Sequence, residues 1–154
     1  MKYILTSLLA LTLFISCNPS DSQPTKTDYT VENEKEIVDY IAKNKLTAKR
    51  TDSGLYYVIN EPGDGAQPTA SSNVTVVYKG YFTNGTVFDQ SKPAGLSFGL
   101  NQVIKGWTEG IPFFKVGGSG ILLVPSHLGY GSYNYGSIPG GSVLIFDVKL
   151  SSIN

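Results

Sequence analysis

The pattern of apolar and polar residues changes character twice along the chain. The first stretch, Ile4–Ile15, is an apolar run interrupted only by Thr and Ser, and a polar stretch follows it. The segment Glu32–Lys45 then repeats apolar residues three and four positions apart, at Ile37, Tyr40 and Ile41. This spacing predicts an amphipathic helix, whose role would be packing on the next domain or simple spacing. From Thr51 onward the spacing becomes that of strands and turns.

Short strands are predicted throughout the C-terminal two thirds of the chain. The stretches with strand-like spacing are Leu55–Asn60, Val74–Phe82, Leu96–Leu100, Gly120–Val124 and Val143–Leu150. In Val74–Phe82 alternate residues would face opposite sides of the sheet. The dipeptide Asn84-Gly85 is a strong hairpin signal, so a strand through Val87 and Phe88 should fold back on Val74–Phe82.

One short helix is predicted among these strands, over Gly106–Phe114. It would be stubby, because Pro112 lacks the N–H that a longer helix needs beyond its first turn. Pro125–Gly141 is rich in Gly, Tyr and Ser and reads as a long ordered loop. Loops longer than about 12 residues are often functional. The expected fold class is therefore α+β, with an antiparallel sheet against one short helix and an amphipathic helix before it.

The N-terminal apolar run is too short to cross a bilayer, which takes about 20 apolar residues. Following the positive Lys2, it fits the apolar region of a secretory signal peptide. Leu13–Cys17 (Leu-Phe-Ile-Ser-Cys) resembles the bacterial lipobox, in which the Cys is acylated. The alternative is an ordinary signal peptide with a coincidental Cys. We therefore expect a lipoprotein signal peptide over 1–16 and lipidation (palmitate) of Cys17.

The same interpretation divides the rest of the chain. A flexible tether is expected over 17–30, because this stretch is polar, contains Pro and has little to bury. An N-terminal helical segment (31–50) and a single domain (51–154) would follow. The protein would then be anchored by lipid to a membrane of the bacterial cell envelope, on the periplasmic or surface side.

Composition removes several classes of function. Twelve Lys and Arg balance twelve Asp and Glu, so no general electrostatic attraction to nucleic acid is expected. One His and one Cys cannot supply the four His and Cys ligands of a structural zinc site. The sequence has no Gly-x-Ser-x-Gly motif, so His127 is not expected to act as the base of a serine nucleophile. Val116–Gly120 lacks the Gly-Lys-Ser/Thr ending of a phosphate-binding loop. No metal or cofactor is therefore expected.

Six short motifs follow one another in the C-terminal part of the chain. They are Ser53–Tyr57, Val76–Gly80, Asn84–Asp89, Val103–Gly110, Pro125–Gly131 with Ile138-Pro139, and Leu144–Leu150. Together they resemble an FKBP-type peptidyl-prolyl cis-trans isomerase domain, here in a bacterial lipoprotein form. The resemblance implies a twisted antiparallel sheet wrapped around one short helix, with a shallow apolar pocket between them.

The resemblance also assigns residues to this pocket. Catalytic positions would be Tyr78, Phe88, Asp89, Ile104, Trp107, Tyr130 and Phe146, and substrate-binding positions Leu96, Val103 and Ile138. Trp107 would form the floor, and Asp89 would accept a hydrogen bond from the Tyr78 phenol. The Ile104 N–H and the Tyr130 hydroxyl would hold substrate carbonyls. Tyr133 and Tyr135 are additional tyrosines for which the resemblance implies no role.

The implied activity is rotation of Xaa-Pro bonds in exported proteins, without a covalent intermediate or a cofactor. Partners would be Xaa-Pro-containing polypeptides and a macrolide inhibitor, and the protein would act as a monomer. Two alternatives stay open at this point. One is a non-catalytic chaperone that binds Pro-containing or unfolded segments, and the other is a scaffold lipoprotein that docks through the Tyr133–Tyr135 loop.

Overall fold

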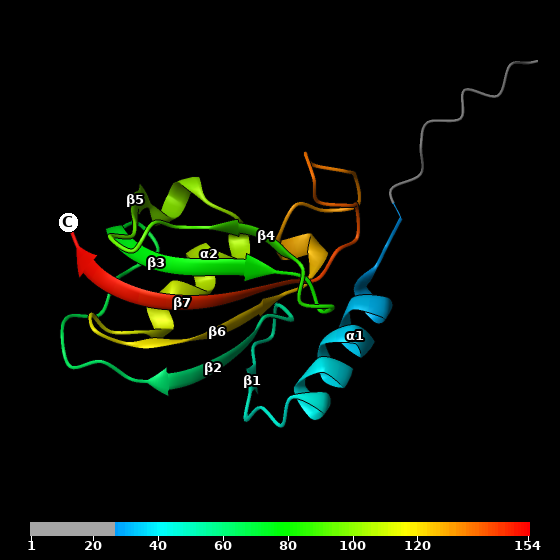
Figure 1. Ribbon diagram of the computed structural model, residues 1–154, viewed down its shortest axis with the longest axis horizontal. Helices are drawn as coiled ribbons and strands as arrows, with labels where there is room; N and C mark the ends of the chain where they lie inside the picture. Colours follow the sequence, from blue (N-terminus) through cyan, green and yellow to red (C-terminus); the bar gives the residue numbers. More distant parts are fainter. Residues whose placement is uncertain (1–26) are drawn as a thin grey trace, which may run out of the picture.

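The computed structural model describes residues 27–154, so the proposed signal peptide, Cys17 and most of the tether lie outside the described residues. In the described part, helix α1 (Thr30–Lys43) precedes seven strands. They are β1 (Lys49–Arg50), β2 (Tyr56–Glu61), β3 (Asn73–Tyr81), β4 (Val87–Gln90), β5 (Leu96–Gly99), β6 (Ser119–Val124) and β7 (Leu144–Ile153). The second helix, α2 (Lys105–Gly110), lies between β5 and β6 in the chain (Figure 1).

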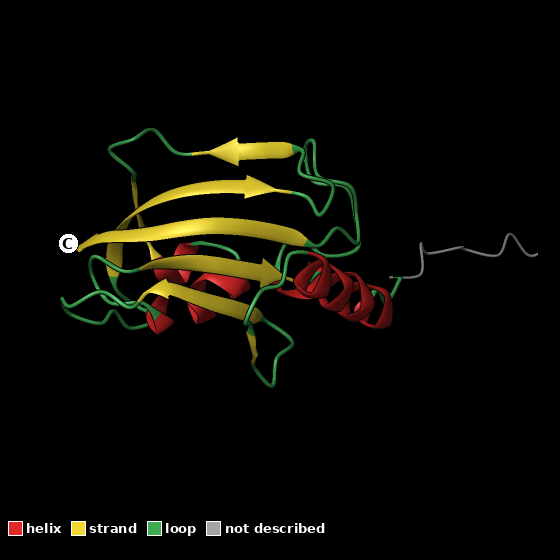
Figure 2. Cartoon of the chain, turned by 60° about the horizontal axis from the view of Figure 1, so that its bottom comes forward, coloured by secondary structure: helices red, strands yellow, loops and turns green. Residues whose placement is uncertain are grey.

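All seven strands form one antiparallel sheet. Its order is β1-β2-β6-β7-β3-β4, and β5 also pairs with β3. The outer edge of β3 is thus shared, with β5 along its first half and β4 along its last residues. Helix α2 lies against one face of the sheet, whereas α1 lies beyond one end of the strands (Figure 2). This arrangement confirms the predicted α+β class.

The predicted strand pattern holds in detail at β3. Val74, Val76 and Gly80 are buried on one side of the strand, as the alternation requires. The hairpin predicted at Asn84-Gly85 is also present, because β4 pairs with β3. The Thr86 N–H donates to the Asn84 side-chain oxygen at 2.9 Å, which stabilises this turn.

The short helix ends earlier than its predicted range. Helix α2 stops at Gly110, and a 3-10 turn (Ile111–Phe113) continues the chain with Pro112 in its first turn. This placement costs no hydrogen bond, because the first residues of a helical turn have no partner for their N–H groups. A side chain at Gly106 would not fit: its Cβ would lie 2.5 Å from a Val124 methyl carbon. The absence of a side chain there lets α2 lie directly on β6.

The helix predicted over Glu32–Lys45 is present, and it makes up the first part of the expected segment 31–50. Helix α1 covers Thr30–Lys43, and Lys49–Arg50 instead pair with β2 as part of the sheet. Ile37 of α1 is fully buried in a second hydrophobic cluster with residues of β2, β6 and the segment just before β7. Helix α1 is therefore packed on the sheet domain.

The last residues of the predicted tether also make tertiary contacts. The Ser132 hydroxyl donates a hydrogen bond to the Thr27 carbonyl at 2.6 Å. Sequence patterning missed this contact because the two residues are more than a hundred positions apart. Within residues 27–154, no helix has the length and apolar character needed to cross a membrane. The same residues contain no group of three or more His, Cys, Asp or Glu side chains placed to hold a metal ion.

Candidate active site

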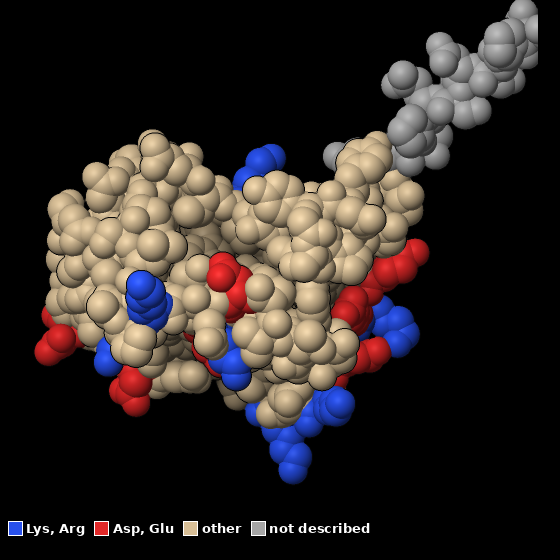
Figure 3. All heavy atoms as spheres, turned by 45° about the horizontal axis from the view of Figure 1, so that its top comes forward, with Lys and Arg blue, Asp and Glu red and all other residues tan. Residues whose placement is uncertain are grey.

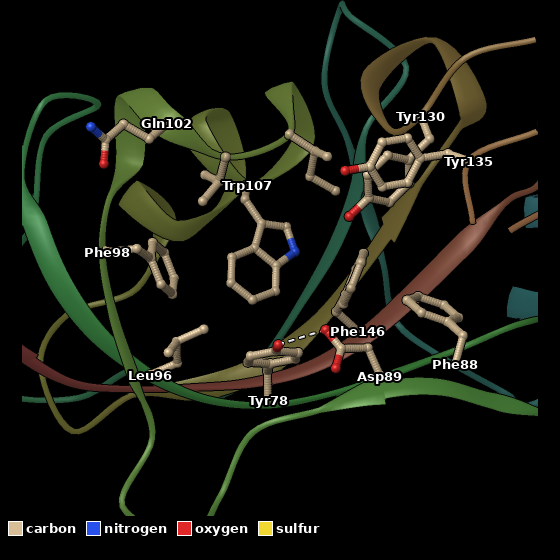
Figure 4. Close-up of a pocket in the computed structure, with 12 residues that line it drawn as sticks. Tyr78, Phe88, Asp89, Leu96, Phe98, Gln102, Trp107, Tyr130, Tyr135 and Phe146 are labelled. Atoms are coloured by element: carbon tan, nitrogen blue, oxygen red, sulfur yellow. Dashed lines mark hydrogen bonds between the residues drawn. The ribbon is translucent and has the colours of Figure 1, made fainter. Parts of the chain in front are cut away.

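A cavity of about 310 Å³ opens above α2, between the outer half of the sheet and the 125–141 loop. Its lining residues come from β3, β4, β5, the start of α2, the loop and β7: Tyr78, Phe88, Asp89, Leu96, Phe98, Gln102, Val103, Ile104, Trp107, Tyr130, Tyr135 and Phe146. Figure 4 shows these side chains converging on a common space. Most charged side chains visible in Figure 3 lie along the lower and right-hand edges of that view. Most of the side chains that line the cavity are aromatic or aliphatic, and Asp89 is the one charged side chain among them in the described chain.

Trp107 forms the floor of the cavity and is only 4% exposed. Three aromatic rings surround its indole at centroid distances of 5.0 Å for Tyr78, 5.3 Å for Phe98 and 5.2 Å for Phe146. The Tyr78 and Phe146 rings meet the indole edge to face, which is a favourable aromatic geometry. The indole N–H is buried and has no hydrogen-bond partner in the described part of the chain. The floor is thus enclosed by aromatic rings and carries one unused donor.

A phenol–carboxylate pair forms the polar edge of the cavity. The Tyr78 Oη donates a hydrogen bond to Asp89 Oδ2 at 2.7 Å, drawn as a dashed line in Figure 4. The pairing of β3 with β4 brings the two residues together, since Gly80 lies opposite Asp89 in the register. Burial, then the hydrogen bond and charge of Asp89, raise the pKa of Tyr78 well above its ordinary value. Tyr78 therefore stays protonated and keeps the carboxylate oriented.

Ile104 stands at the start of α2, immediately before its first residue. Its carbonyl accepts hydrogen bonds from the Trp107 and Thr108 N–H groups at 2.9 and 3.2 Å. The first N–H groups of a helix have no carbonyl of their own helix to bind. Ile104 and Val103 line the cavity at this point. The start of α2, with the backbone N–H of Ile104, therefore lies at the cavity wall, where a ligand carbonyl could bind.

Tyr130 and Tyr135 form the rim on the side of the 125–141 loop. Their rings stack with centroids 4.5 Å apart and planes inclined by 12°. Partial burial, followed by the nearby Tyr135 and Asp89, raises the pKa of Tyr130. The Tyr130 hydroxyl is therefore a protonated donor beside the cavity.

Nine of the ten predicted pocket residues line this one cavity, and Ile138 does not. Ile138 is buried in the main hydrophobic core, and its backbone exchanges two hydrogen bonds of 2.9 Å with that of Tyr135. Its backbone therefore holds Tyr135 of the rim, and its side chain is not among those that line the cavity.

Sequence reasoning missed three lining residues: Phe98, Gln102 and Tyr135. Phe98 could have been found, because it lies two positions after Leu96 on the same face of β5. Gln102 lies in a 3-10 turn and Tyr135 in an irregular loop, where no periodicity predicts direction. His127 lies outside the cavity, with its Nε2 2.8 Å from the Ser53 carbonyl.

Residues 65–151 match the family described as FKBP-type peptidyl-prolyl cis-trans isomerase. The chain is 46% identical over 127 residues to the FKBP-type isomerase FkpA of Aeromonas hydrophila, covering 80% of this chain and 47% of the relative. It is 47% identical over 108 residues to the probable FkpA of Neisseria meningitidis, covering 68% and 40%. The chain thus spans about half the length of the curated relatives it matches.

Two solved structures are similar over most of the described chain. The crystal structure of FkpA from Escherichia coli aligns with a TM-score of 0.68 and 38% identity, covering 80% of this chain and 63% of that one. A peptidyl-prolyl cis-trans isomerase from Pseudomonas syringae aligns with a TM-score of 0.70 and 30% identity, covering 81% and 96%.

Proposed function

Because the chain belongs to the FKBP-type peptidyl-prolyl cis-trans isomerase family, we propose that it accelerates rotation about Xaa-Pro bonds in polypeptides. The observation that carries the proposal is the cavity over Trp107, which is walled by aromatic rings and edged by the Tyr78–Asp89 pair. A prolyl ring is apolar and compact, so such a cavity suits it. The named relatives support the same activity.

Rotation about the Xaa-Pro bond is slow because resonance makes the amide planar, with a barrier of about 18–20 kcal/mol. The twisted transition state has lost much of the charge separation of the planar amide. A dry apolar cavity disfavours the polar planar form more than the twisted one, which lowers the barrier. Each 1.36 kcal/mol gained in this way is about tenfold in rate.

The polar groups around the cavity orient the substrate. The backbone N–H of Ile104 and the hydroxyl of Tyr130 would hold carbonyls on either side of the proline, while the ring rests on Trp107. Asp89 is fixed by Tyr78 and acts electrostatically beside the amide. It is not a general base, because bond rotation transfers no proton. Because rotation neither makes nor breaks a covalent bond, the reaction needs no nucleophile, metal or cofactor.

The direct test is a cis–trans isomerisation assay of the full chain on peptides that vary in Xaa, repeated with a macrolide. We expect clear acceleration, blocked by a macrolide that occupies the same cavity. His127→Ala is a suitable control, since this side chain lies outside the cavity, and it should keep full activity. A folded protein without acceleration would contradict the proposal and favour non-catalytic capture of Pro-containing segments.

The proposal extends to location. Acylation of Cys17 would anchor the protein to a bacterial envelope membrane, on the periplasmic or surface side, where exported proteins are its substrates. The lipobox-like Leu13–Cys17 and the apolar run before it support this. Several acyl chains anchor stably, whereas one chain binds only marginally. We further propose that the protein acts as a monomer.

A further inference from the structure

Asn33 of α1 is a buried polar residue, 1% exposed, outside the cavity. Its Nδ2 donates to the Gly141 carbonyl at 2.8 Å, and its Oδ1 accepts from the Ser126 N–H at 2.8 Å. Ser126 and Gly141 lie at the two ends of the loop that carries Tyr130 and Tyr135. One side chain of the N-terminal helix therefore joins both ends of the rim loop. Figure 1 shows the beginning of α1 beside this loop.

The loop closes the connection with two backbone hydrogen bonds of its own. The Gly141 N–H donates to the Gly131 carbonyl at 2.9 Å, and the Gly131 N–H donates to the Ser126 carbonyl at 2.8 Å. Together with the two bonds of Asn33, they form a closed ring of four hydrogen bonds. In this ring the Asn33 amide takes the place of a peptide group, because it offers a donor and an acceptor in one plane.

Gly131 links this ring to the cavity. It follows Tyr130 directly in the chain and has a φ of +82°, a conformation that favours glycine. Its N–H and its carbonyl both take part in the ring, so the peptide groups before and after Gly131 are each held by one hydrogen bond. The ring thereby sets the direction in which the Tyr130 side chain leaves the loop.

Neighbouring contacts hold the same junction. The Tyr29 ring packs on Gly141 so closely that a Cβ there would lie 2.6 Å from it. Ser132 follows Gly131 in the chain, and its hydroxyl donates a hydrogen bond to the Thr27 carbonyl. The segment before and within α1 therefore supports the rim loop at several points, and Asn33 forms a hydrogen bond with each end of the loop.

We propose that Asn33 is a positioning residue for Tyr130, which makes α1 part of the catalytic unit. This inference rests on the proposed isomerase function. Without the amide, the Ser126 N–H and the Gly141 carbonyl would be left buried without partners, and the loop would have to rearrange to hydrate them. Tyr130 would then lose its place relative to the cavity, although the floor around Trp107 would stay intact.

The test compares Asn33→Leu, which has similar volume and no hydrogen bonds, with Ile37→Val. Ile37 is a buried residue of the same helix outside the ring, so this variant controls for loss of stability. Both are assayed as full chains well below their melting temperatures. We expect Asn33→Leu to lower kcat on the order of tenfold with a smaller change in KM. Ile37→Val should keep wild-type kcat.

A double-mutant cycle with Tyr130→Phe shows whether Asn33 acts through Tyr130. If it does, Asn33→Leu should have little further effect once the Tyr130 hydroxyl is gone. Full additivity of the two losses would overturn the proposal. Asn33→Asp, which keeps the acceptor and loses the donor, provides the same cycle should Asn33→Leu fail to fold.

A structural readout separates this inference from the proposed function. Two NMR signals are followed in each variant: the nuclear Overhauser effect between the Tyr130 and Tyr135 rings, and the chemical shift of the Gly131 amide. We expect both to change in Asn33→Leu and to persist in Ile37→Val. If the wild type proves inactive as an isomerase, the proposed function fails. The NMR signals would still test whether Asn33 positions the Tyr130 ring. Unchanged signals with wild-type kcat would overturn the positioning role.

Discussion

The rings of Tyr130 and Tyr135 lie nearly parallel, with their centroids 4.5 Å apart and their planes inclined by 12°. Tyr135 is 62% exposed and Tyr130 is 38% exposed, yet both line the cavity over Trp107. The backbone of Tyr135 is held by two hydrogen bonds to Ile138, so its ring is presented on a tight turn. A tyrosine to which the family resemblance assigned no role thus extends the wall of the cavity and stacks on a predicted catalytic residue.

Removal of this stack should weaken catalysis. We expect Tyr135→Ala to lower kcat/KM several-fold, because an aromatic pair contributes about 0.5–1.5 kcal/mol and Tyr130 would lose its support. Tyr135→Phe keeps the stacked ring and should restore most of the activity. Tyr133→Ala serves as the control, since Tyr133 lies in the same loop but does not line the cavity. Equal losses in Tyr133→Ala and Tyr135→Ala would contradict a specific role of the stack.

The Tyr78–Asp89 hydrogen bond should matter more for rate than for stability. We expect Asp89→Ala to reduce kcat/KM at least about tenfold, because it removes the charge beside the substrate amide. Tyr78→Phe should cause a smaller loss, since the carboxylate remains but is no longer oriented. Peptide isomerisation rates and thermal melts of both variants provide the measurement. An active Asp89→Ala variant with a normal melt would refute the assignment of this site.

Activity should be independent of pH through the neutral and mildly alkaline range. The raised pKa values of Tyr78 and Tyr130 keep both phenols protonated beyond the ordinary tyrosine value of 10.0. An alkaline limb of kcat/KM centred clearly below this value would be inconsistent with hydroxyl donors at these positions. The measurement is a pH–rate profile with a peptide that does not itself titrate in this range.

Stability should fall only in strong alkali. A folded-state pKa above the unfolded value means that the native phenols bind protons more tightly, so this contribution is fully present below about pH 10. It is lost as the pH rises from there through the folded-state values. Urea unfolding between about pH 8 and pH 11 should show the decline, and Tyr78→Phe should make it shallower. An identical slope in that variant would exclude Tyr78 as a contributor.

The contact between α2 and β6 should tolerate no added volume. A Cβ at Gly106 would lie 2.5 Å from Val124 Cγ1, so we expect Gly106→Ala to destabilise the protein by about 1–3 kcal/mol. Lys105→Ala changes an exposed residue of the same helix and should alter stability by less than about 0.5 kcal/mol. Denaturant unfolding of the two variants tests this. Equal stabilities would show that α2 can shift away from the sheet.

The proposed lipid anchor depends on one residue. Cys17→Ser should abolish incorporation of labelled palmitate and move the protein from the membrane fraction to the soluble fraction of a bacterial host. Isomerase activity of the released protein should be unchanged, because the cavity lies in the domain after α1. Retention of Cys17→Ser in the membrane without label would contradict acylation as the anchor.

Features that depend on residues close together in the chain could be predicted before the fold was known. The alternation in β3, the Asn84-Gly85 hairpin and the shortness of the helix near Pro112 follow from local stereochemistry. The ordered motifs placed the chain in its family, and they identified Trp107, Tyr78 and Asp89 as residues of one pocket. Such motifs are informative because each one fixes the residue types of a strand or helix end that faces the same cavity.

The contacts of the N-terminal helix with the rim loop join residues far apart in the chain, so the sequence pattern did not predict them. The hydrogen bond from Asn33 to Gly141 joins residues 108 positions apart, and nothing in the helical pattern of α1 distinguishes this Asn from a solvated one. Likewise, Tyr135 reaches the cavity from an irregular turn that is closed by its two backbone hydrogen bonds to Ile138. Periodicity predicts which face of a regular element is buried, but side chains in loops are directed by hydrogen bonds to distant backbone groups, and these exist only once the chain has folded.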